Sequence, residues 1–298
     1  MNRPFAGAVT ASIALAGAAG AAALAAPASA APTAGPATAP AGPAAPAGPA
    51  ARGHGEADFT GIVALSNCSG SLVRGPRSRD SDAALVLTNG HCLEGGMPEP
   101  GQVIVDRPSA RAFTLLDRTG RSSLGTLRAT RVEYSTMTDT DVTVYRLDES
   151  YGTIRKRYGV PALRLSTAPP HDGTEIRVVS GYWQTSYACK TDATVYRLRE
   201  AGWTWKDSIR YTPQCRTVHG TSGSPVIDAN THHVVAINNT GNDDGERCTL
   251  NNPCEVDRKG NVTVRQGTHY AQQTYPLARC LGEGNDVALG GSCALPRP

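Results

Sequence analysis

One serine in this sequence lies in a turn of a kind that can expose a nucleophile. Ser222 is bracketed by Gly220 and Gly223, in the segment Val218–Ile227 that runs from small polar residues into a hydrophobic strand. Glycine lets the backbone turn sharply and approach a ligand closely, and the amides of Gly220 and Ser222 could both point at one oxyanion. A serine hydroxyl is a weak nucleophile at neutral pH, so the hypothesis requires a base and an orienting group. A plain surface turn has the same composition.

The best candidate for the base is His91, which follows a hydrophobic segment. Leu85–Leu87 leads into a turn at Asn89 and Gly90, and His91 directly precedes Cys92. A disulfide there would hold the imidazole rigidly, as a general base requires. An ordinary loop histidine is the alternative. The remaining histidines lack this setting. We expect His219 to line the substrate cleft, and we expect surface or structural roles for His54, His171, His232, His233 and His269.

The third group should be a carboxylate that orients the imidazole and stabilises its cation. Asp141 opens the β-branched segment Val142–Val144, so its side chain would project from a loop–strand junction. Asp139 is the competitor, two residues earlier and on the same face of an extended chain. A solvated acidic loop is the alternative. We favour Asp141 because the strand begins directly after it.

Four segments, taken in order, resemble motifs of the trypsin-like (chymotrypsin-fold) serine endopeptidases. They are Cys68–Val73, Leu87–Cys92, Asp141–Val144 and Gly220–Pro225. The chain order His, Asp, Ser is that of this family, and other hydrolase folds use other orders. Bacterial secreted members are the most similar in style, above all the glutamyl endopeptidase branch, which carries Ser-Gly-Ser-Pro-Val at its nucleophile.

The resemblance implies an all-β fold of two six-stranded antiparallel β-barrels, with the active site in the cleft between them. It implies that Ser222 is the nucleophile, His91 the general base and acid, and Asp141 the orienting carboxylate, with the oxyanion hole formed by the amides of Gly220 and Ser222. The reaction would be peptide hydrolysis through an acyl-enzyme. The resemblance also implies a Cys68–Cys92 disulfide that fixes the His91 loop.

Two departures from the family pattern concern activation. Thr221 stands where the common motif has an aspartate directly before the serine, and Phe59–Val63 replaces the usual Ile-Val-Gly-Gly start. In trypsin-like zymogens that aspartate pairs with a newly freed N-terminal amine. We therefore do not expect activation by such an ion pair.

Residues before and after the serine motif predict an acidic or polar side chain at P1 of the substrate. Thr217 matches a threonine that glutamyl endopeptidases use to bind an acidic side chain, whereas their partner histidine is replaced by Asn238, next to Asn239. Arg216 could pair with a carboxylate in the same pocket or point to solvent. No aspartate stands where a trypsin has one at the pocket base, so cleavage after Lys or Arg is not expected.

The rest of the folded part consists of short β-rich segments separated by Gly, Pro, Asn and Asp, a pattern typical of an all-β barrel or sandwich. Residues 163–170 are expected to cross between two halves, and 271–280 to form a short terminal helix interrupted by Pro276. The expected strands are Thr60–Leu65, Ala83–Leu87, Val103–Val105, Asp141–Leu147, Glu175–Val179, Thr194–Leu198, Pro225–Ile227 and His233–Ile237.

The beginning of the chain predicts export. Residues 1–30 combine Arg3, an Ala-rich apolar segment and the small residues Ala28–Ala30, typical of a signal peptide cleaved after Ala30. Residues 31–54 are almost wholly Ala, Pro, Gly and Thr, and are expected to be a disordered linker or short leader. The protease domain would span 55–298, with barrels over about 55–160 and 165–298. No second apolar segment of about 20 residues follows, so no membrane anchor is expected.

Eight cysteines in an exported chain predict disulfides rather than thiols. Pairing sequence neighbours gives Cys68–Cys92, Cys189–Cys215, Cys248–Cys254 and Cys280–Cys293, although eight cysteines allow 105 pairings. No zinc spacing is present. The loop 242–246 offers oxygen ligands without the alternation of a calcium loop, so we expect neither a metal nor a cofactor.

Charge argues against a nucleic-acid partner. Two of the 29 basic residues precede Gly53, leaving 27 against 26 acidic residues and no basic stripe. We expect a monomeric enzyme acting on protein or peptide substrates. The alternatives are a catalytically inactive secreted binding protein on the same fold and a disulfide-rich structural protein. The second leaves the ordered motifs unexplained.

Overall fold

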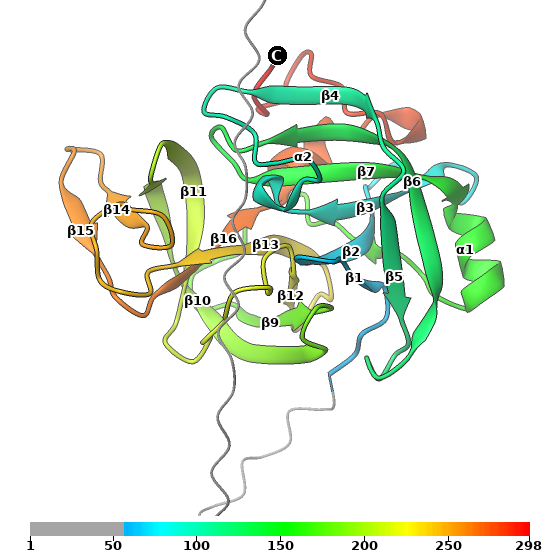
Figure 1. Ribbon diagram of the computed structural model, residues 1–298, viewed down its shortest axis with the longest axis horizontal. Helices are drawn as coiled ribbons and strands as arrows, with labels where there is room; N and C mark the ends of the chain where they lie inside the picture. Colours follow the sequence, from blue (N-terminus) through cyan, green and yellow to red (C-terminus); the bar gives the residue numbers. More distant parts are fainter. Residues whose placement is uncertain (1–56) are drawn as a thin grey trace, which may run out of the picture. The chain divides into compact units, whose positions relative to one another are not determined.

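Sixteen β-strands form the frame of the molecule in the computed structural model, which describes residues 57–298. The predicted signal peptide, the whole of the predicted linker and the first two residues of the predicted protease domain lie outside the described residues. The strands form two sheets, one ahead of residue 165 and one after it. Figure 1 shows them side by side, with β1–β7 to the right and β9–β16 to the left.

The first sheet closes into a six-stranded antiparallel barrel. Its order is β1-β5-β6-β7-β3-β2, and pairing of β2 with β1 completes the ring. Another strand, β4, pairs with β6, and the two-residue β8 runs parallel to β2. The strands are β1 (Ile62–Ala64), β2 (Ser69–Arg74), β3 (Ala83–Thr88), β4 (Val103–Pro108), β5 (Ala112–Leu116), β6 (Ser123–Thr136), β7 (Val142–Ser150) and β8 (Leu163–Arg164).

The second sheet closes in the same way. Its ring is β11-β16-β13-β12-β9-β10, completed by pairing of β10 with β11, and the hairpin β14–β15 extends it from β10. The expected fold of two six-stranded barrels is therefore confirmed. The strands are β9 (Glu175–Ser180), β10 (Thr185–Glu200), β11 (Trp203–Tyr211), β12 (Pro225–Asp228), β13 (Val234–Gly241), β14 (Cys254–Val256), β15 (Val262–Val264) and β16 (His269–Gln273).

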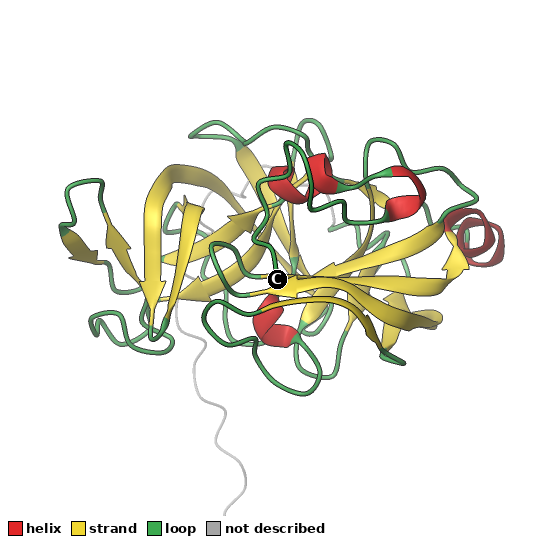
Figure 2. Ribbon diagram, turned by 90° about the horizontal axis from the view of Figure 1, so that it is seen from above, coloured by secondary structure: helices red, strands yellow, loops and turns green. Residues whose placement is uncertain are grey.

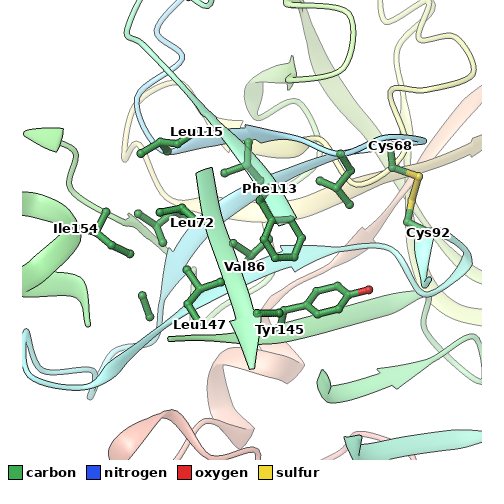
Figure 3. Close-up of a cluster of buried hydrophobic side chains, with 14 of the residues drawn as sticks. Cys68, Leu72, Val86, Cys92, Phe113, Leu115, Tyr145, Leu147 and Ile154 are labelled. Carbon is green, nitrogen blue, oxygen red and sulfur yellow. A yellow bond between two sulfur atoms is a disulfide. The ribbon is translucent and has the colours of Figure 1, made fainter. Parts of the chain in front are cut away.

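Apolar side chains fill the first barrel and the space between the barrels. The interior of the first barrel contains Leu72, Val86, Phe113 and Tyr145, with the Cys68–Cys92 disulfide at one end (Figure 3). On β3 the neighbours of Val86 point the other way, and Leu85 and Leu87 pack against second-barrel residues. Because β3 is buried on both faces, its sequence is a continuous apolar segment rather than an alternating one.

Helices are few and short, as Figure 2 shows. The helix α1 (Tyr151–Tyr158) begins where the Ser150 side chain accepts a hydrogen bond from the Thr153 amide, and ends at Gly159, which has the left-handed φ of 71° favoured at that position. The expected terminal helix is shorter than predicted: α2 covers Tyr275–Cys280, while residues 271–273 belong to β16. Pro276 lies in its first turn, where the missing amide hydrogen costs nothing, so it starts this helix instead of interrupting it. Two single 3₁₀ turns, η1 (Gly90–Cys92) and η2 (Glu283–Asn285), complete the elements.

The eight cysteines form four disulfides, and the pairs are those of sequence neighbours: Cys68–Cys92, Cys189–Cys215, Cys248–Cys254 and Cys280–Cys293. Within residues 57–298, no helix has the length and apolar character needed to cross a membrane.

Candidate active site

His91 and Asp141 meet at the edge of the first barrel. His91 lies in the 3₁₀ turn after β3, and Asp141 directly precedes β7, which pairs with β3. Both carboxylate oxygens of the fully buried Asp141 contact His91: Oδ1 accepts from its backbone amide at 3.0 Å, and Oδ2 lies 2.7 Å from Nδ1. Nε2 is thereby left as the ring nitrogen that can exchange a proton with a bound molecule.

The surroundings of this pair are tightly fixed. The Asn89 side-chain amide donates to the Asp141 carbonyl at 3.0 Å. A side chain at Gly90 would collide with the Thr136 carbonyl, only 2.3 Å from an added Cβ, so only glycine allows the turn to approach β6 this closely. The Cys68–Cys92 disulfide adjoins His91 and ties its turn to the start of β2.

Burial and neighbouring charge have opposite effects on the pKa of His91. Burial alone would lower the pKa of the imidazole, but the negative charge and hydrogen bond of Asp141 outweigh it, with a further contribution from the charge of Glu200. The net result is a pKa above the usual value of histidine. Such an imidazolium is stabilised during a reaction, as a general base requires.

Ser222 faces the same cleft from the second barrel. It lies in the turn before β12, and its Oγ donates to the Asn239 carbonyl of β13 at 3.3 Å. His91, Ser222 and the residues around them line one cleft of about 320 Å³. The cleft thus combines a partly exposed serine hydroxyl with a histidine paired to a carboxylate, a set that supports nucleophilic catalysis.

The turn before Ser222 leaves two backbone amides free at the cleft. Gly220 has a left-handed φ of 88°, which favours glycine. In the described part of the chain, neither the Gly220 amide nor the Ser222 amide has a hydrogen-bond partner, and both residues line the cleft. Two free amides beside a serine can stabilise one oxyanion.

Thr221 has a structural role where the related motif has an aspartate. It is buried, its hydroxyl bonds to the Val218 carbonyl, and it accepts a hydrogen bond from the Asn238 side chain at 3.1 Å. The turn is therefore held by neutral groups. An ion pair with a freed N-terminus has no counterpart at this position.

The cleft also contains three of the four residues predicted for the substrate pocket. Thr217, Asn238 and Asn239 are buried and line it. Arg216 is exposed and is not among the lining residues, so the structure does not bring it to the pocket. Asp139, the competitor of Asp141, pairs instead with Lys206 at 2.6 Å.

His219 and His269, neither of which was expected to take part in catalysis, line the cleft together with the acidic residue Asp243. His219 Nε2 lies 2.9 Å from the Asp243 carboxylate, as part of the expected cleft wall. His269, expected to be a surface or structural residue, lines the cleft beside Gly241. Burial lowers the pKa of His269, and the nearby Asp243 offsets this only in part.

Glu200 was missed by sequence reasoning altogether. It is 5% exposed, lines the cleft, and its Oε1 accepts from the Asn251 amide at 2.9 Å. Burial raises its pKa, an effect that hydrogen bonds from Thr240 and Asn251 reduce. It ends β10, at a position with no motif around it; only the fold brings it close to His91.

A cluster of potential metal ligands adjoins the site. Within residues 57–298, the one group of three clustered His, Cys, Asp or Glu side chains is Cys68, His91 and Cys92. Both sulfurs are in a disulfide and are not available as thiolate ligands.

A family model and several solved structures are similar to this chain. Residues 68–237 match the family model of the trypsin-like peptidase domain. Similar solved structures include a protease of M. tuberculosis, Rv3671c, in its active form (15% identity, TM-score 0.46, covering 82% of this chain and 84% of that one). Others are the MamO protease domain from Magnetospirillum magneticum (11%, TM-score 0.47, 76% and 98%) and a Glu endopeptidase (15%, TM-score 0.41, 72% and 85%). No curated protein matches.

Proposed function

We propose a mechanism and a substrate preference from one premise: the chain belongs to the trypsin-like peptidase family and is a serine endopeptidase. In this proposal Ser222 is the nucleophile, His91 the general base and acid, and Asp141 the orienting carboxylate. The observation that carries it is the 2.7 Å contact between His91 Nδ1 and the buried Asp141, in the cleft that also holds Ser222. Asp141 would fix the imidazole tautomer and stabilise its cation.

The reaction would proceed in two transfers. His91 Nε2 takes the Ser222 proton as Oγ attacks the peptide carbonyl, and the amides of Gly220 and Ser222 donate to the resulting oxyanion. The tetrahedral intermediate expels the amine, which receives the proton from His91, and an acyl-enzyme remains on Ser222. Water then loses a proton to His91, attacks the ester and releases the acid product, regenerating the Ser222 hydroxyl.

For P1 we propose an acidic or polar side chain. Thr217, His219 and His269 supply polar groups to the cleft wall. Asp243 Oδ2 is already bonded to His219, so part of the capacity of this carboxylate for a P1 cation is in use. A neutral His269 can donate or accept a hydrogen bond, and when protonated it would attract a P1 carboxylate. Arg216 has no part in this proposal.

We further propose that the chain is secreted, with a signal peptide over 1–30, a linker or leader over 31–54 and the protease domain over 55–298. Four disulfides support an oxidising compartment. Because Thr221 is held by neutral groups, removal of the leading segments would be the only processing that the enzyme needs.

The test uses a fluorophosphonate, which phosphonylates an activated serine. Intact mass of the secreted protein, before and after labelling, should show one adduct that peptide mapping places on Ser222, and none in Ser222→Ala. The starting mass should also report four disulfides and a mature N-terminus near Ala31. Absence of an adduct on the processed protein would refute the proposed triad and favour the inactive binding protein.

A further inference from the structure

The carbonyl groups of the turn at residues 218–222 are all held by hydrogen bonds. Three accept from backbone amides: Val218 from Thr221, Thr221 from Ser224, and Ser222 from Ser69. The other two depend on side chains. Gly220 O accepts from the Ser69 hydroxyl at 3.1 Å, and His219 O accepts from the indole Nε1 of Trp183 at 2.6 Å.

The bond to His219 fixes the peptide group that carries the Gly220 amide. This peptide is trans, since the described chain has no cis bond, and in a trans peptide the C=O and N–H point in opposite directions. Holding the His219 carbonyl outward on Trp183 therefore turns the Gly220 N–H inward to the cleft. Rotation of this peptide would place a carbonyl oxygen where the oxyanion must form.

We propose that Trp183 is a positioning residue for the oxyanion hole: its indole N–H holds the His219–Gly220 peptide in the orientation that the reaction requires. The inference rests on the proposed function, because it assigns a role to the Gly220 amide in that mechanism. Trp183 acts through the backbone and does not itself contact the reacting atoms.

The setting of Trp183 supports a dedicated role. It follows β9, where Trp183 N donates to the Ser180 hydroxyl at 3.2 Å, and that hydroxyl lies 3.0 Å from Ser69 Oγ. The Tyr182 amide also donates to Ser69 Oγ, at 3.1 Å. The two buried hydroxyls of Ser69 and Ser180 thus hold both the loop that carries the indole and the carbonyl of Gly220.

Packing fits the same assignment. Tyr182 and Trp183 form an edge-to-face pair with ring centroids 4.9 Å apart, against the outer side of Gly220. A Cβ added to Gly220 would lie 2.8 Å from Trp183 Nε1 and from a Tyr182 ring carbon. Trp183 is nevertheless 52% exposed. An exposed indole contributes little to the core, so the feature that sets this side chain apart is its N–H bond to the His219 carbonyl.

The decisive variant is Trp183→Phe, which keeps an aromatic ring and removes the donor. With a p-nitroanilide substrate, which has no residue beyond the scissile bond, we expect kcat to fall about 10- to 100-fold and KM to stay within about threefold. This is less than the roughly 10²–10³-fold that follows outright loss of an oxyanion donor, because the peptide still samples the productive orientation. A peptide aldehyde, which forms the tetrahedral oxyanion, should lose affinity in parallel with kcat.

Two controls separate this role from a loss of structure. Tyr182→Phe keeps the ring pair and should leave kcat unchanged, and replacement of Trp183 by benzothienylalanine removes only the N–H and should reproduce the Phe variant. The acid limb of the pH profile, which reports His91, should not move. A kcat equal to wild type in both Trp183 variants would overturn the inference. Wild-type protein without Ser222-dependent hydrolysis would instead refute the proposed function, and this inference with it.

Discussion

The two sides of the cleft differ in how far their polar groups are satisfied. On the first-barrel side, Asp141 uses both carboxylate oxygens on His91. On the second-barrel side, the buried Asn238 Oδ1 and both side-chain polar atoms of Asn239 have no partner in the described structure, whereas beside His91 only Asn89 Oδ1 lacks one. Leaving buried polar atoms unpaired costs free energy. One side is therefore built for a single arrangement, and the other keeps capacity for a bound molecule.

The mode of anchoring shows the same contrast. The His91 turn is fixed by a disulfide and a glycine that packs against a backbone carbonyl. The Ser222 turn is fixed by hydrogen bonds to groups from three other segments: Ser69, Trp183 and Asn238. Disturbing the first side should abolish the chemistry, whereas changes on the second side at residues other than Ser222 itself should tune rate, pH dependence or specificity.

Among these tests, Asp141→Asn on the first-barrel side should cause the largest loss of kcat. The amide keeps the size of the carboxylate but favours the wrong imidazole tautomer and cannot stabilise the cation, so kcat should fall about 10⁴-fold. Steady-state hydrolysis at the pH optimum measures this. Asp139→Asn is the matched control and should retain wild-type kcat, since Asp139 pairs with Lys206. Equal losses in the two variants would disprove the assignment of Asp141.

Removing the Cys68–Cys92 disulfide beside His91 should have the second largest effect. Replacing Cys68 and Cys92 together by alanine should lower the free energy of unfolding by about 2–4 kcal/mol, because the loop they close regains entropy when unfolded. It should also lower kcat, as the His91 turn loosens. Denaturant unfolding and hydrolysis assays measure the two effects.

The matched control is the Cys280–Cys293 pair, which lies outside the cleft. Its replacement by alanine should destabilise the protein in a similar way and leave kcat unchanged. If both double variants kept full kcat under folding conditions, the disulfide at His91 would have no role in positioning.

The proposed catalytic residues could be predicted from the sequence to a greater extent than the residues around them. Ser222 and His91 are in local motifs, and Asp141 starts a β-branched strand, so short segments carry their signals. Two six-stranded barrels followed from a resemblance in four such segments. The strand β6 escaped prediction entirely and β10 in part, because their exposed positions carry charged residues, which are uncommon in strands.

The positions of Glu200, His269 and Trp183 near the cleft could not be predicted from local sequence motifs. Each reaches the cleft or its turn through pairing of strands distant in sequence: Glu200 ends β10, His269 begins β16 and Trp183 follows β9. No spacing rule links them to Ser222. Arg216, by contrast, has a charge that could pair with a substrate carboxylate and directly precedes Thr217, but its side chain is exposed and lies outside the cleft.

Glu200→Gln should shift the pH profile rather than abolish activity. The charge of Glu200 raises the pKa of His91. In the proposed mechanism the neutral imidazole of His91 is the base, so activity should be lost as the pH falls through that raised pKa. Removing the charge lowers the His91 pKa, and the acid limb of kcat should move to lower pH by less than about one unit, which corresponds to 1.36 kcal/mol. A profile unchanged between pH 4 and 8 would show that Glu200 does not influence His91.

The smallest expected effect concerns specificity. Burial lowers the pKa of His269, so the ring is neutral at neutral pH and becomes a cation only in more acidic solution. Paired substrates with Glu or Gln at P1 should therefore show a Glu-to-Gln ratio of kcat/KM that rises as the pH falls towards that lowered pKa, until the substrate carboxylate itself is protonated. His269→Gln keeps hydrogen bonding without the charge, so the rise in this ratio should disappear. The ratio should differ from that of the wild type by about 10-fold or less, as expected for one solvent-accessible charge pair. A pH-independent ratio in the wild type would exclude His269 from P1 recognition and place the preference with the neutral donors of the pocket.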